Sequence, residues 1–129
     1  METRELAVGL GGARIGIGMM SLVAPGLVGR AMTGPDGSTG ATRLFARMVG
    51  VRDVGLGLGV LLALERGAPV RGWLEASAVV DGMDAGACLL ARRHLRTGVF
   101  PAAVGMATAG ALLSGWLSRE LDAPGGITA

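Results

Sequence analysis

Apolar residues gather in four long segments of the chain, which short polar breaks separate. The segments cover approximately residues 6–28, 44–64, 73–91 and 98–118. An α-helix of about 20 residues spans about 30 Å, the thickness of the hydrocarbon core of a membrane. None of the segments alternates strictly between apolar and polar residues, as a half-buried β-strand would. The pattern predicts an all-α fold, a four-helix transmembrane bundle.

The three breaks carry turn-forming residues. They read TGPDGSTG over residues 33–40, ERGAP over residues 65–69 and RRHLRTG over residues 92–98. Gly and Pro at such places end helices. Because short connections place consecutive helices side by side and antiparallel, we expect an up-down bundle that forms one domain over residues 1–129. Residues 119–129 are expected to form a flexible tail.

The composition favours a membrane protein over a soluble one. Half of the 129 residues are hydrophobic and 17% are charged, whereas charged residues make up about 25% of ordinary soluble domains. The mean hydropathy is +0.54. A soluble four-helix bundle is the alternative, because only the fourth segment is free of charges over a membrane-spanning length. The 24 glycines, however, suit helices in water poorly.

Charged residues lie near the middle of three segments, where a membrane would make them most costly. Arg14 lies in the first segment, Arg52 and Asp53 lie in the second, and Asp81 and Asp84 lie in the third. Antiparallel helices bring these positions to a similar depth, and an unpaired charge there costs about 3 kcal/mol or more. We therefore predict that opposite charges pair in one ionic cluster. Its expected members are Arg14, Arg47, Arg52, Asp53, Asp81 and Asp84.

This cluster has two interpretations. In the first, the pairs fix helix register and orientation, and the protein has a structural or partner-binding role without enzymatic activity. In the second, Asp81 and Asp84 lie one helical turn apart on the face that also carries Ser77, and their repulsion leaves one of them protonated near neutral pH unless an arginine lies between them. Such a group would serve a proton-coupled carrier or channel component, or a cofactor-free membrane enzyme of the isomerase or cyclase type.

Small residues four positions apart recur along the segments, and such pairs let transmembrane helices approach closely. We expect them to pack the helices together. Besides the lipid bilayer, the expected partners are a second copy of the chain or another membrane protein. The pairs in the first three segments are Gly12 and Gly16, Gly55 and Gly59, and Gly82 and Gly86.

Metal, cofactor and nucleic-acid binding are not expected. Cys88 is the only cysteine, and the only histidine, His94, lies six residues beyond it, so the chain lacks a ligand set for a transition metal. The basic residues are twelve arginines spread over all segments without interleaved aromatic residues. Nucleic-acid-binding surfaces concentrate such residues on one face.

The distribution of arginines also predicts an orientation. Five lie in or next to the first and third breaks, against four on the other side. Cytoplasmic loops carry an excess of basic residues, so we expect these two breaks on the cytoplasmic side and both termini outside. The five are Arg30, Arg43, Arg92, Arg93 and Arg96, and the four are Arg4, Arg66, Arg71 and Arg119.

Two stretches of the chain carry a resemblance to a known group. They are RMVGVRD (residues 47–53), followed by GLGLGVLLAL, and VVDGMDAGACLLARR (residues 79–93). They resemble small four-helix bacterial membrane proteins of unknown function in the neighbourhood of the DoxX-like group, in which an R-x-x-G-x-R-D element lies in helix two and an aspartate-containing element in helix three. The resemblance implies a multi-pass protein of the bacterial cytoplasmic (inner) membrane. It implies no established activity.

Overall fold

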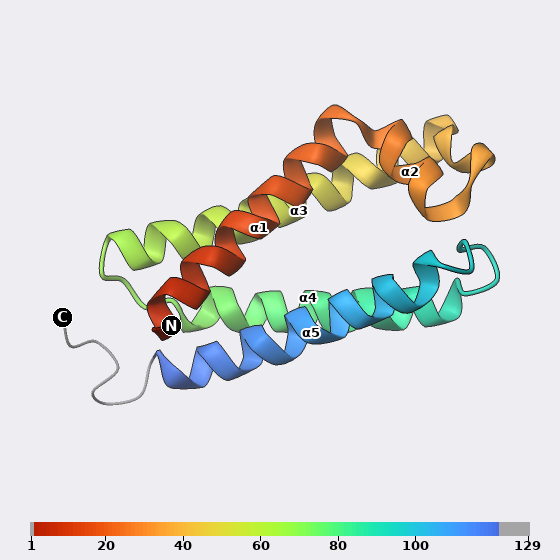
Figure 1. Ribbon diagram of the computed structural model, residues 1–129. Coiled ribbons are helices and arrows are strands. Elements are labelled where there is room, and N and C mark those ends of the chain that lie inside the picture. The colour runs from red at the N-terminus through yellow and green to blue at the C-terminus, as the bar shows by residue number, and fades with distance from the viewer. Residues whose placement is uncertain (1, 122–129) are drawn as a thin grey trace.

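The chain folds into helices only, over the part that the structure covers. The computed structural model describes residues 2–121, and no strand occurs among them (Figure 1). The all-α prediction is confirmed. The elements are α1 (Thr3–Val23), α2 (Pro25–Thr33), the 3-10 turn η1 (Pro35–Ser38), α3 (Gly40–Glu65), α4 (Arg71–Leu90) and α5 (Val99–Glu120).

The first and last helices end at other residues than predicted. The predicted helix over residues 6–28 is too long, because α1 ends at Val23 and a separate short helix begins at Pro25. Proline has no N–H to donate and disfavours the helical conformation in the residue before it, and Ala24 accordingly has φ −125° and ψ 54°. Helix α5 continues to Glu120, so the predicted tail does not begin at 119. Its residues 122–129 lie outside the described residues.

Local signals set both ends of α3. The Thr39 side chain accepts a hydrogen bond from the backbone N–H of Thr42 at 3.2 Å, which satisfies one free donor of the first turn. At the other end Gly67 has φ +60° and the N–H of Ala68 donates to the carbonyl of Ala63 at 2.9 Å, the pattern of a Schellman cap. These caps give α3 its length of 26 residues and place the Arg-Asp pair of this helix at its centre.

The four long helices form two antiparallel hairpins. Helix α1 packs along α3, and α4 packs along α5, whereas contacts between the two hairpins are few. In Figure 1 the hairpins lie close together at the end that carries the N-terminus, and they diverge toward α2. The fold is therefore a pair of hairpins joined over part of their length, and it is not an evenly packed bundle.

Glycines seven residues apart hold α1 against α3. A Cβ atom placed on Gly18 would lie 2.7 Å from the carbonyl oxygen of Gly50, and one placed on Gly57 would lie 2.5 Å from that of Gly11. The backbones thus approach too closely for any side chain at these positions. The spacing of seven keeps the contact on one seam of two helices that cross at a small angle.

Of the six glycines in the predicted pairs, one lies in a contact between described helices. Only Gly59 is covered, by the ring of Trp73, while a Cβ atom on any of the other five would meet no atom within 4 Å. The reason is that each segment holds several glycines, so a spacing of four occurs on more than one face. The other five are Gly12, Gly16, Gly55, Gly82 and Gly86.

The hydrophobic core lies at one end of the molecule. It is small and combines the start of α1 and α4 with the end of α3 and α5, near the N-terminus in Figure 1. No described residue of α4 after Asp81, and none of α5 before Ser114, is buried. The buried hydrophobic residues are Ala7, Val60, Ala63, Val70, Leu74, Leu117 and Leu121.

Candidate functional site

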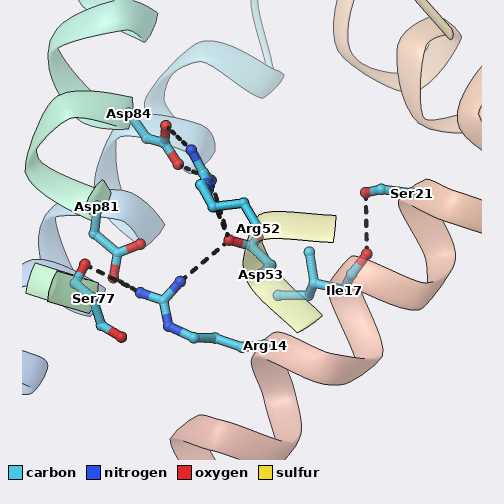
Figure 2. A network of polar contacts seen from close by, with 8 residues as sticks. All are labelled: Arg14, Ile17, Ser21, Arg52, Asp53, Ser77, Asp81 and Asp84. Carbon is cyan, nitrogen blue, oxygen red and sulfur yellow. Dashed lines mark hydrogen bonds and ion pairs between the residues drawn. The ribbon is translucent and has the colours of Figure 1, made fainter. Parts of the chain in front are cut away.

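Charged side chains from three helices meet between the two hairpins, next to the hydrophobic core. Figure 2 shows Arg14 of α1 and the pair Arg52 and Asp53 of α3 facing Asp81 and Asp84 of α4. All five lie near the middle of their helices. We call these five residues the charge cluster. The structure thus brings together five of the six residues predicted for it.

Arg14 connects both hairpins. Only 7% of this residue is exposed. Its Nη1 donates to Asp53 Oδ1 of its own hairpin at 3.4 Å, and its Nη2 donates to Asp81 Oδ2 of the other hairpin. Nη2 also donates to the backbone carbonyl of Ser77 at 3.3 Å. A single guanidinium therefore forms ion pairs with carboxylates on both sides of the junction.

Arg52 makes a second connection toward the side where the hairpins diverge. Its Nη1 and Nη2 donate to Asp84 Oδ1 and Oδ2 at 3.0 and 2.7 Å, and this two-pronged geometry is the strongest form of an arginine–carboxylate pair. Its Nε and Nη2 also donate to Asp53 Oδ1 at 3.2 and 3.1 Å. The Asp84 side chain is 39% exposed, so this pair forms the rim of the cluster and Arg14 its centre.

The three carboxylates are unequally compensated. Among the described residues, Asp53 Oδ1 accepts from three arginine N–H groups and Asp84 accepts two hydrogen bonds, whereas Asp81 accepts from Arg14 alone. With every group ionised, three carboxylates would face two guanidinium groups. An excess negative charge is expensive in a low-dielectric interior, and Asp81 is the carboxylate with the fewest donors to stabilise it.

Arg47 is not part of the charge cluster, contrary to the prediction. It is exposed, and it forms no ion pair among the described residues. It lies nearly two helical turns before Asp53 and about 120° away from it around α3. The prediction grouped Arg47 with Asp53, but of the two only Asp53 forms ion pairs in the cluster between the hairpins.

The interior around the cluster is polar. Arg14 Nε and the hydroxyl groups of Ser77 and Ser114 are fully buried and have no hydrogen-bond partner among the described residues. Seven buried residues of the described chain are polar or charged, as many as are hydrophobic. Soluble domains bury few such groups. The polar members are Arg14, Ser21, Asp53, Ser77, Asp81, Ser114 and Ser118.

The outside of the molecule is apolar over the length of the helices. Twenty-one large hydrophobic residues of the described chain are exposed, among them Met83 and Leu112, which are 69% and 70% exposed. A soluble monomer rarely exposes large apolar side chains in such number. The described chain thus buries more polar side chains and exposes more large apolar ones than a soluble bundle does.

One residue of the site carried little signal in the sequence. Gly110 of α5 lies against Asp81, because a Cβ atom on Gly110 would be 2.5 Å from Asp81 Oδ2. A larger residue would displace the carboxylate from Arg14. The fourth segment holds no charged residue that would show which of its faces turns inward. Only the small size of Gly110 could have indicated such a contact.

Metal binding finds no support in the described residues, where no group of three His, Cys, Asp or Glu side chains could hold an ion. His94 lies exposed in the turn between α4 and α5.

Two of the described helices, α1 and α5, are long and apolar enough to cross a membrane. Comparisons with family models, curated proteins and solved structures gave no match to the chain.

Proposed function

We propose that the protein is a small polytopic protein of the bacterial cytoplasmic membrane in which α1, α3, α4 and α5 all cross the bilayer. The observation that carries this proposal is that charged side chains lie inside the fold, whereas 21 large hydrophobic residues of the described chain are exposed. Lipid tails suit such an exterior, and pairing makes charges inside tolerable. The charges of α3 and α4 face each other, which removes the main objection to these helices as membrane spans.

In this proposal the charge cluster is a structural core that joins the two hairpins. Contacts between the hairpins are few, and hydrophobic attraction between helices is absent in lipid. The ion pairs of Arg14 and Arg52 with α4 then supply the specific attraction across the junction. We also propose that the protein belongs to the DoxX-like neighbourhood. In the R-x-x-G-x-R-D element of this chain, Gly50 contacts α1, and Arg52 and Asp53 form ion pairs, so these residues serve the packing of the helices.

A partner-binding role belongs to the same proposal. Gly12 and Gly16 are exposed on α1, and nothing in the described chain covers them. Such a smooth strip suits close contact with a helix of a second copy or of another membrane protein. We assign the protein no enzymatic activity and no cofactor in this proposal.

The membrane location is tested by washing the membrane fraction of expressing cells with alkaline carbonate. The chain is expected to stay in the pellet, because lipid contacts hold it independently of charge. Its matched control is a peripheral membrane protein from the same cells, which the wash releases. Recovery of the chain in the supernatant together with the peripheral protein would contradict the proposal and support the soluble bundle.

A second candidate function is that of a proton-coupled carrier or channel component, which one observation favours. The cluster holds one carboxylate more than guanidinium groups, and Asp81 has the fewest donors. If Asp81 exchanges a proton, infrared spectra in nanodiscs recorded from pH 4 to 9 should show a protonated carboxyl band that disappears as the pH rises. A carrier that works near neutral pH needs this change near neutrality. The band should vanish in Asp81→Asn and persist in Asp84→Asn. Spectra in which all carboxylates stay ionised over this pH range would contradict the proton-coupled function, and the structural role would be the one that remains.

A further inference from the structure

Exposed arginines collect at the end of the molecule where the hairpins diverge. Figure 1 places α2, the start of α3 and the turn between α4 and α5 at this end, away from the N-terminus. We call it the basic end. Its exposed arginines come from segments far apart in the sequence, and they are Arg30 in α2, Arg43 in α3, and Arg92, Arg93 and Arg96 in the turn.

Contacts between these segments make the basic end one surface. The backbone N–H of Arg96 donates to the carbonyl of Met32 at 3.0 Å, which ties the turn to α2. The Arg43 side chain lies against α2 as well, since a Cβ atom on Gly26 would be 3.2 Å from its Nε. The fold thus gathers arginines that the sequence spreads over three segments.

The positive charge of the basic end is not neutralised within the described chain. Asp36 is the one acidic residue there, and none of the five arginines takes part in an ion pair. The opposite end carries arginines together with most acidic residues outside the charge cluster. Those acidic residues are Glu2, Glu5, Glu65, Glu75 and Glu120. The molecule is therefore strongly asymmetric in charge along its length.

We infer that the basic end binds the phosphate groups of anionic phospholipids in the leaflet that it faces. The inference rests on the proposed membrane location. Exposed Leu27, Phe45 and Leu90 reach up to this end, so its arginines lie at the border between apolar and polar surface, where lipid headgroups lie. Guanidinium groups donate to phosphate in a two-pronged fashion. The cytoplasmic leaflet carries a negative surface potential, so this placement agrees with the prediction that both termini lie outside.

The test compares the thermal unfolding of the purified full chain in nanodiscs of phosphatidylcholine alone and of phosphatidylcholine mixed with phosphatidylglycerol. The wild type should unfold about 5 °C higher with the anionic lipid, and about 0.5 M salt should remove most of this gain. The triple variant Arg92→Gln, Arg93→Gln and Arg96→Gln should lose the gain. The matched control changes Arg4, Arg66 and Arg119 of the other end to Gln and should keep it.

Three results would overturn the inference. They are no gain in the wild type, an equal gain in both triple variants, and an equal gain on adding inorganic phosphate to phosphatidylcholine discs, which would assign the surface to a free anion. Release of the chain by the carbonate wash is a different result. That outcome contradicts the membrane location itself, whereas a failed lipid test in a chain that stays in the membrane contradicts only the lipid surface.

Discussion

Replacing Arg14 with methionine should destabilise the protein by about 3–5 kcal/mol, the effect of removing one partner from a buried ion pair. Methionine fills similar space but leaves Asp81 and the Ser77 carbonyl without their arginine donor, and it removes one of the three donors to Asp53. The cluster would then hold three carboxylates and one guanidinium. Thermal unfolding in detergent micelles, followed by the helical circular dichroism signal, measures the loss.

The control for this substitution is Arg47→Met on α3. Arg47 is exposed and forms no ion pair with another described residue, so its replacement should change the free energy of unfolding by less than about 0.5 kcal/mol. Similar losses in the two variants would mean that an arginine stabilises the protein equally whether or not it forms a buried ion pair. The ion pairs of Arg14 would then not hold the hairpins together.

Replacing Gly50 with valine should open the seam between α1 and α3 and cost at least about 2 kcal/mol. The added Cβ would lie 2.6 Å from the carbonyl oxygen of Gly18, and a backbone carbonyl inside a helix cannot move aside as a side chain can. The helices must separate, which also draws Asp53 away from Arg14. The same unfolding measurement detects the effect.

Gly55→Val is the matched control, since it puts the same residue into the same helix. A Cβ atom there meets nothing within 4 Å. Both substitutions therefore change the helix propensity of α3 in the same way, but only Gly50→Val creates a clash with α1. Gly55→Val should leave stability close to that of the wild type. Equal destabilisation by both variants would contradict the close approach of α1 and α3.

The amino-acid sequence predicted the all-α fold and the chemistry of the cluster better than it predicted the packing. Arg14, Asp53 and Asp81 lie at matching positions along antiparallel segments, and an unpaired charge at such depth is costly enough to demand a partner. That constraint is strong because few residues can satisfy it. Pairing between segments could therefore be predicted without knowledge of the helix contacts.

Helix contacts depend on which face of each helix turns inward, and the sequence left this open. Glycines occur on several faces, so the GxxxG pairs pointed to Gly12 and Gly16, whereas the contact uses Gly11 and Gly18. Arg47 was assigned to the cluster because the helical period shows roughly which residues share a side of a helix. It does not show how much of that side the other hairpin contacts. The break at Pro25, in contrast, was predictable from the chemistry of proline.

The gathering of arginines at the basic end was also hidden in the linear sequence. Arg43 and Arg96 belong to different hairpins, and they share a surface because α2 folds back against α3 and meets the turn at Met32. Counts of arginine per loop recorded a difference of five against four. The structure adds that most of the described acidic residues outside the charge cluster lie at the other end, which makes the asymmetry large.

A double-mutant cycle on Arg14 and Asp81 measures whether ion pairs join the two hairpins. Unfolding would be compared for Arg14→Met, Asp81→Asn and the double variant in the same lipid. We expect the second substitution to add no loss to Arg14→Met, because it removes the carboxylate left unpaired, and the coupling energy to exceed about 1 kcal/mol. Losses that add within about 0.5 kcal/mol would show that the two side chains do not interact, and would contradict the account.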